Sequence, residues 1–267
     1  MTTEGSNPPR RHVVLAQAIG GRKVQEDSLW YQIEEEVGLY FLVVCDGAGG
    51  HGGGKDASKT AIDSARRMWS KRVTGPLQAG DFEGEDWGQF LTELTAKANS
   101  EIKEMNAQMG KNSRSTFVAL VVDGSTATWA HAGDSRLYRF ADGVEEYRTE
   151  DHSVPQMLLD RGKITKEELG DHPDQNRLLR GLGGNHADPD VSTMDDVDPT
   201  HSFLLCSDGF WTTLEGPGNT MRSYDGDPQT VPARIKKEIL GILEQTNNDG
   251  DNISVAFLTQ SSDEKIG

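Results

Sequence analysis

Two Asp-Gly pairs in the middle of the chain restrict the fold more than any other sequence feature. Asp123-Gly124 and Asp142-Gly143 each lie between apolar, strand-like runs. An Asp-Gly pair in this context is the strongest local signal for a β-hairpin, because both turn residues can adopt positive φ. Residues 115–147 are therefore predicted to form short antiparallel strands.

Further strand and helix patterns surround these hairpins. Strands are expected at residues 12–19, 29–33, 38–45 and 252–259, and helices at 55–71, 87–109 and 232–245. Thr165 and Glu168 form a capping box for one short helix. This order predicts an α+β domain in which two packed sheets are flanked by helices. The long central helix carries an apolar stripe at the 3.6-residue period, which is predicted to be core: Trp87, Phe90, Leu91, Leu94, Ala98, Ile102, Met105 and Met109.

No linker, repeat or low-complexity tract divides the 267 residues. We therefore expect a single domain over residues 12–260, with a flexible N-terminal tail at 1–11 and a C-terminal tail at 261–267. The polar segment 153–180 belongs to this domain and is expected to be helical in pieces. Cys45 and Cys206 lie inside apolar strand runs, as reduced core cysteines do.

The charge balance argues against nucleic acid as a partner. The chain carries 27 basic and 43 acidic residues, a net charge of −16. Sequence-independent binding to DNA or RNA relies on clustered Lys and Arg against phosphates. No apolar stretch is long enough to span a bilayer, and residues 2–11 lack the apolar region of a signal peptide. These features predict a cytoplasmic protein.

Acidic residues recur at the ends of the predicted strands. A carboxylate at the end of a buried strand is costly unless a positive charge compensates it. Several of them together suggest that the strands converge on a hard-cation site. Carboxylates suit Mg²⁺ or Mn²⁺, whereas the chain has no HExxH or CxxC spacing for zinc. The residues concerned are Glu26, Asp27, Asp46, Asp134, Asp208 and Asp251.

Two such ions that share a carboxylate would make a bridging water a nucleophile at neutral pH and neutralise a phosphoryl group under attack. The turn that begins at Asp46 suits a bridge, because Gly47 lets a backbone carbonyl approach a metal closely. Arg22 lies four residues before Glu26, and its guanidinium could bind two phosphate oxygens.

The glycine loop also admits a nucleotide-binding interpretation. Gly49 to Lys55 nearly fits the phosphate-binding P-loop, with a strand before it and a helix after it. However, Asp56 replaces the hydroxyl that would hold Mg²⁺. The antiparallel hairpins also conflict with the parallel βα order of P-loop proteins. A P-loop-like NTPase is therefore the weaker alternative.

The acidic segments, taken in order, resemble the motifs of the PP2C (PPM) family of metal-dependent protein Ser/Thr phosphatases, bacterial type. The motif R-x-x-N-E-D-S resembles residues 22–28 (RKVQEDS), with Gln25 in place of Asn, and D-G-M-G-G-H resembles 46–51 (DGAGGH). G-D-S-R-x-Y resembles 133–138 (GDSRLY), and S-D-G-L/F-W/T resembles 207–211 (SDGFW). Further matches are Ser115-Thr116, 151–153 (DHS), 179–183 (LRGLG) and 251–254 (DNIS). Together they extend from about residue 13 to 258.

The resemblance implies a four-layer α-β-β-α sandwich with two central antiparallel sheets and a metal cleft at one end. It implies two Mn²⁺ or Mg²⁺ ions, bridged by Asp46, and a third, weaker ion at Asp134. Asp208 and Asp251 would complete one site, and Glu26 and the Gly47 carbonyl the other. Asp27 would orient ligands or water from behind, Arg22 would bind the substrate phosphate, and segment 153–180 would be the flap beside the cleft.

Ala48 stands where some relatives carry a histidine proposed as general acid. The leaving serine oxygen would then take its proton from metal-bound water or from His51. The implied activity is hydrolysis of phosphoserine and phosphothreonine in proteins, which reverses a Ser/Thr protein kinase. The remaining alternative is a catalytically inactive relative that binds phosphoproteins. Loss of metal ligands would indicate it, but Glu26, Asp46, Asp208 and Asp251 are all present.

Overall fold

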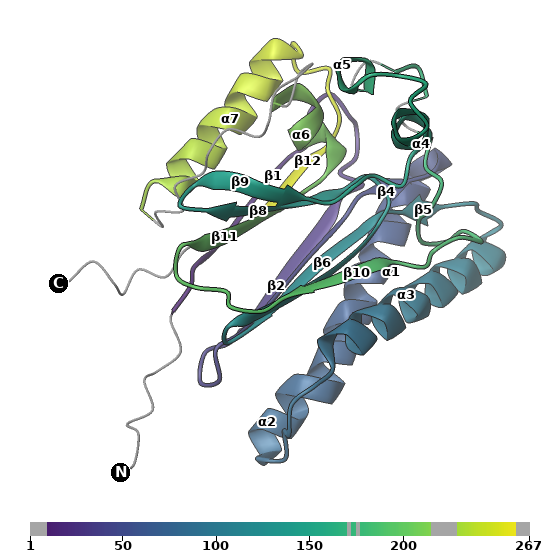
Figure 1. Ribbon diagram of the computed structural model, residues 1–267. Coiled ribbons are helices and arrows are strands. Elements are labelled where there is room, and N and C mark those ends of the chain that lie inside the picture. Colours follow the sequence, from purple (N-terminus) through teal and green to yellow (C-terminus); the bar gives the residue numbers. More distant parts are fainter. Residues whose placement is uncertain (1–9, 170–171, 175–176, 215–228, 260–267) are drawn as a thin grey trace.

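Two five-stranded antiparallel sheets lie face to face at the centre of the molecule (Figure 1). The computed structural model describes residues 10–169, 172–174, 177–214 and 229–259. The first sheet has the order β10 (Asp190–Met194), β7 (Thr126–Ala132), β6 (Phe117–Asp123), β3 (Leu39–Cys45) and β2 (Ser28–Glu34). The second has the order β1 (Val13–Ala18), β12 (Ile253–Leu258), β11 (His201–Cys206), β8 (Arg136–Ala141) and β9 (Val144–Arg148).

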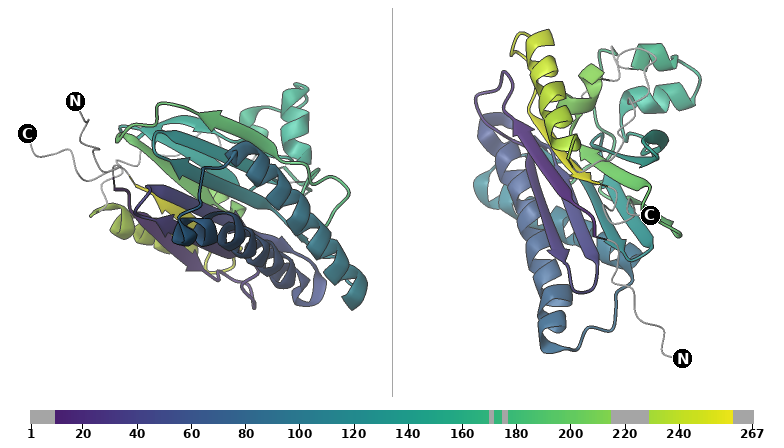
Figure 2. Two further views of the ribbon diagram at one scale, coloured as in Figure 1. Left: turned by 90° about the horizontal axis from the view of Figure 1, so that it is seen from below. Right: turned by 90° about the vertical axis from the view of Figure 1, so that its left-hand side faces the viewer.

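Helices cover the outer face of each sheet. In the right-hand view of Figure 2, α1 (Gly53–Trp69) and α3 (Trp87–Met109) lie on one side of the sheets and α7 (Val231–Gln245) on the other. The short helix α6 (Asp208–Leu214) packs with α7 on the second sheet. A π-helical turn (Ser70–Thr74) and α2 (Gly75–Ala79) extend α1. The predicted α-β-β-α sandwich is confirmed.

Strand β3 shows why its sequence is apolar at every position. Side chains of a strand point alternately to its two faces. Phe41 and Val43 pack in the cluster that contains α1 and α3, whereas Leu42 and Val44 pack between the two sheets against the second sheet. Because both faces are covered, all seven residues are buried.

Both predicted hairpins are present, but the turn of one of them is shifted by one residue. Asp142 and Gly143 have φ of 48° and 79°, as a two-residue turn with both central residues at positive φ requires. At the other hairpin, Asp123 still belongs to β6, so Gly124 and the next residue form the turn. The central helix has the predicted bounds, but Met109 is 56% exposed at its last position, so the prediction that it is core was wrong.

The segment 153–180 leaves and rejoins the sandwich at one place. It contains α4 (Val154–Asp160) and α5 (Lys166–Leu169), and the capping interaction from Thr165 N to Glu168 is present at 2.8 Å. Val154 N donates to Arg177 O, and Leu179 N donates to His152 O, so the two ends of the segment are hydrogen-bonded side by side.

The ends of the domain are only partly described. Residues 1–9 and 260–267, which include most of both predicted tails, lie outside the described residues. Arg11 is buried, and its side chain donates to the carbonyl oxygens of Asp198 and His201, so the packed part of the chain includes it. Within the described ranges, no helix combines the length and apolar character that a membrane crossing requires.

Candidate functional site

A cleft of about 240 Å³ lies where strands of both sheets end, and it collects most of the predicted site residues. Asp46 follows β3 in the first sheet, and Asp208 follows β11 in the second. Seven of the nine predicted residues line the cleft: Arg22, Glu26, Asp46, Gly47, Asp134, Asp208 and Asp251. Asp27 lies behind them, and His51 belongs to the 3₁₀ turn Gly50–Gly52, with its side chain outside the described part.

Thr116 fixes the backbone of Asp46 on both sides. Its N–H donates to Asp46 O, and Asp46 N donates to its hydroxyl, both at 2.8 Å. The same hydroxyl is 2.7 Å from the hydroxyl of Ser135, which follows Asp134. One buried threonine therefore connects the turn of Asp46 to the turn of Asp134.

Close backbone packing positions the other acidic residues. A Cβ at Gly209 would lie 2.1 Å from the carbonyl oxygen of Asn252, so glycine is required for the approach of Asp208 to Asp251. A Cβ at Gly47 would likewise lie 2.1 Å from Gly54 O. Glu26 N donates to the side chain of Asn252 at 2.7 Å, which brings the residue-26 turn to the end of the chain.

Positive charge compensates the carboxylates of the cleft only in part. Burial raises the pKa of Asp46 and of Asp134 well above the ordinary value, and the charge of Asp208 raises both further. Burial also raises the pKa of Asp208, to about 7, with Asp251 adding to the effect. Oδ1 of Asp208 is buried without a hydrogen-bond partner. Arg22 offsets only part of this charge, through an ion pair of 2.5 Å with Asp251.

This arrangement fits divalent cations. Buried carboxylate oxygens, an orphaned carboxylate oxygen and closely packed backbone form the oxygen-rich environment that hard cations prefer. Unpaired carboxylates in such a place stay ionised only if a positive charge compensates them.

Asp27 is buried behind the cleft. Its carboxylate accepts a hydrogen bond from Ser207 Oγ at 2.9 Å, and Ser207 precedes Asp208. Burial raises the pKa of Asp27 to about 6, although the hydroxyls of Ser254 and Ser207 oppose the change. This position suits the predicted role of holding the metal-ligand segments from behind, which stays a prediction.

A buried ion pair near Asp134 was not anticipated from the sequence. Arg136 donates two hydrogen bonds of 2.8 Å to Asp151, and both side chains are almost fully buried. The guanidinium lies 3.3 Å from the ring centroid of Trp211, whose indole N–H donates to Asp134 O at 2.9 Å. Both residues belong to family motifs, but they are 15 residues apart in the sequence, so their contact could not be predicted from it.

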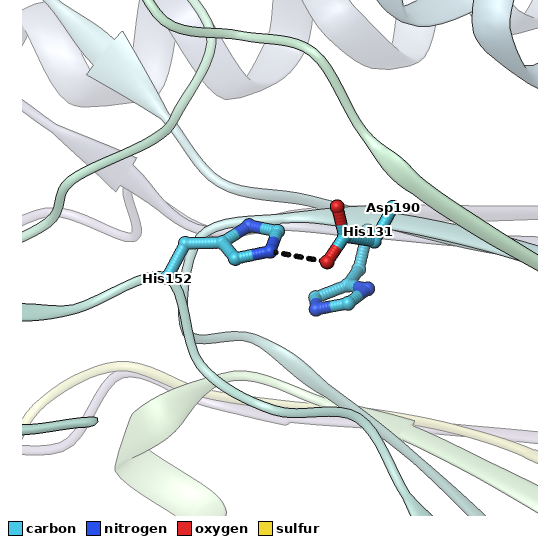
Figure 3. A group of neighbouring side chains, drawn as sticks. All are labelled: His131, His152 and Asp190. Carbon is cyan, nitrogen blue, oxygen red and sulfur yellow. Dashed lines mark hydrogen bonds and ion pairs between the residues drawn. The ribbon is translucent and has the colours of Figure 1, made fainter. Parts of the chain in front are cut away.

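A second cluster, outside the cleft lining, was also missed. His131, His152 and Asp190 come from three distant segments, and their ligand atoms lie within 4.8 Å of one another (Figure 3). Gly133 N donates to His152 Nδ1, so the neutral ring carries its proton on Nε2 and donates to Asp190 at 3.0 Å. Arg180 pairs with Asp190 at 2.5 Å, so this carboxylate already has a compensating charge.

The chain is similar in sequence to known serine/threonine phosphatases. No family model matches it. It is 34% identical over 226 residues to the serine/threonine phosphatase stp of Listeria monocytogenes serotype 4b, covering 84% of this chain and 86% of that protein. It is 28% identical over 254 residues to a putative protein phosphatase 2C-type of Streptococcus pyogenes serotype M6, covering 94% of this chain and 98% of that protein.

A solved structure extends the comparison to the fold. The catalytic domain of the serine/threonine protein phosphatase PstP, in complex with two manganese ions, superposes with a TM-score of 0.69 at 22% identity. The match covers 93% of this chain and 97% of that one. The two-sheet sandwich is thus shared with that catalytic domain. The chain belongs to the PP2C-type (PPM) family of serine/threonine phosphatases.

Proposed function

We propose that this protein hydrolyses phosphoserine and phosphothreonine in other proteins, with Mn²⁺ or Mg²⁺ as cofactor. The observation that carries the proposal is the convergence of seven motif residues on one cleft whose carboxylates are only partly compensated by positive charge. The family relationship and the two manganese ions of the PstP domain support it.

The cleft residues divide into ligand sets. Asp46 would lie between two ions, with Asp208 and Asp251 on one and Glu26 and the Gly47 carbonyl on the other. Asp134 would contribute to a third, weaker site. When bound, such ions lower the pKa of water and neutralise charge on the phosphoryl group.

Arg22 would bind the substrate phosphate. Its side chain is 54% exposed at the cleft, and one terminal nitrogen already donates to Asp251. A guanidinium has five N–H donors in a planar fork, so Arg22 can hold two phosphate oxygens beside the acidic residues. Ala48 offers no proton for the leaving oxygen, and His51 stays a candidate for that role.

The alternative functions are less well supported. β3, which precedes the glycine loop, pairs antiparallel with both of its neighbours, unlike the strand before a P-loop. The metal-ligand candidates are all in place, which argues against an inactive binding protein. We also infer that the protein acts in the cytoplasm, where it reverses a Ser/Thr protein kinase. The free, buried Cys45 and Cys206 fit a reducing compartment.

The activity is tested directly with p-nitrophenyl phosphate and a phosphothreonine peptide. We expect phosphate release with Mn²⁺, loss of turnover after EDTA treatment, and recovery when Mn²⁺ is restored. An ATP hydrolysis assay under the same conditions serves as the control for the nucleotide-binding alternative. Turnover that persists after complete removal of metal would contradict the proposed function.

A further inference from the structure

Arg114 is a basic residue that lines the cleft, and it has no part in the proposed metal binding or phosphate binding. It lies on the short strand β5 (Arg114–Ser115), directly opposite Ala48 on β4 (Gly47–Ala48). On the other side, Ser115 exchanges two backbone hydrogen bonds with Leu182, which follows the segment 153–180. The backbone at Arg114 is therefore held between the turn of Asp46 and the exit of the predicted flap.

The Arg114 side chain packs against two glycines. A Cβ at Gly184 would lie 2.4 Å from a terminal nitrogen of Arg114 and 3.4 Å from the central guanidinium carbon. A Cβ at Gly183 would lie 3.5 Å from the Arg114 Cδ. The half-buried guanidinium thus lies against the bare backbone of Gly184, and any side chain there would displace it.

Arg114 differs from its basic neighbours in lacking an acidic partner. Arg22 pairs with Asp251, Lys111 with Asp56 and Arg180 with Asp190. Among the residues that the structure describes, the Arg114 side chain forms no ion pair and no hydrogen bond, although the protein carries a net charge of −16. The N–H donors of its guanidinium are therefore available to an anion that enters the cleft.

We propose that Arg114 binds a second oxyanion of the substrate, next to the phosphoserine or phosphothreonine that is hydrolysed. The inference rests on the proposed function. The oxyanion is either the carboxylate of a flanking Asp or Glu or a second phosphate, because the planar guanidinium matches both in bidentate geometry. Arg114 is then a specificity-determining residue that favours acidic or multiply phosphorylated segments.

The test uses phosphothreonine peptides that differ only in their flanks. One set has neutral flanks, a second places a single glutamate at successive positions on either side, and a third places phosphoserine there instead. The wild-type protein with Mn²⁺ is expected to show a KM about tenfold lower for the best acidic or doubly phosphorylated peptide, which corresponds to about 1.4 kcal/mol. The peptide set that shows the effect identifies which oxyanion is bound.

Substitutions test whether Arg114 causes the preference for acidic or doubly phosphorylated peptides. Arg114→Ala is expected to abolish the ratio of kcat/KM between flanked and neutral peptides, and Arg114→Lys to retain only part of it, because an ammonium lacks the planar fork. Arg22→Ala should raise KM for all peptides alike and keep the ratio. Lys103→Ala removes the same charge from an exposed position on α3 and should leave the ratio unchanged.

The outcomes separate this inference from the function on which it rests. A wild-type protein that hydrolyses every peptide equally, or an Arg114→Ala variant that keeps the preference, overturns the inference and leaves the phosphatase activity established. A wild-type protein that hydrolyses none of the peptides in the presence of Mn²⁺ contradicts the proposed function itself.

Discussion

Asp46→Asn is expected to lower kcat by on the order of a thousandfold or more, which corresponds to about 4 kcal/mol of lost transition-state stabilisation. The amide keeps the shape of the side chain but removes the charge of the proposed bridging ligand. The backbone hydrogen bonds of Asp46 with Thr116 should remain, because they do not involve the carboxylate. Steady-state kinetics on a phosphothreonine peptide at saturating Mn²⁺ measures the effect.

Thermal unfolding of the metal-free protein shows whether the variant is folded. Because Asp46 is a carboxylate without compensating charge, its neutralisation should leave the metal-free protein at least as stable as the wild type. Asp63→Asn on the exposed side of α1 removes an equal charge far from the cleft lining and should keep wild-type turnover. A kcat for Asp46→Asn within tenfold of the wild type would reject the bridging role.

Asp151→Ala is expected to lower the free energy of unfolding by about 3–5 kcal/mol, because it leaves the buried Arg136 guanidinium without its carboxylate partner. The two hydrogen bonds of 2.8 Å and the near-complete burial of both side chains make this pair unlike the exposed pairs of the protein. Urea unfolding of the metal-free protein measures the change.

Two control proteins show whether that loss of stability comes from breaking the buried ion pair. Asp63→Ala breaks the exposed pair with Lys59 on α1 and should change stability little. The double substitution Arg136→Met with Asp151→Leu removes both charges, and it should recover much of the lost stability. A loss below about 1 kcal/mol for Asp151→Ala would show that water or the remaining partners of Arg136, such as Tyr138, compensate its charge, contrary to its buried position.

The strands and the positions of the acidic residues could be predicted because their signals are local. Apolar runs, an Asp-Gly pair between two such runs, and an aspartate directly after a strand can each be recognised within about ten residues of sequence. The long helix α3 was predicted with its observed bounds for the same reason. The prediction that Met109 is core was wrong because its spacing places it on the apolar face, whereas the helix ends at this residue, beyond the core.

Contacts between distant segments could not be predicted in this way. The pairing of Arg136 with Asp151, the cluster of His131, His152 and Asp190, and the placement of Arg114 against Gly184 all depend on how the segments meet in space. The elements β10 and α6 have short or polar sequences, and neighbouring parts of the fold stabilise them. The family motifs marked several of these residues without showing what they contact.

Anomalous diffraction from crystals soaked in Mn²⁺ tests most directly whether the converging carboxylates hold a pair of cations. The expected result is two manganese peaks that share Asp46, one contacted by Asp208 and Asp251 and the other by Glu26 and the Gly47 carbonyl. No manganese in the cleft at saturating concentration, or peaks that Asp46 does not contact, would contradict it.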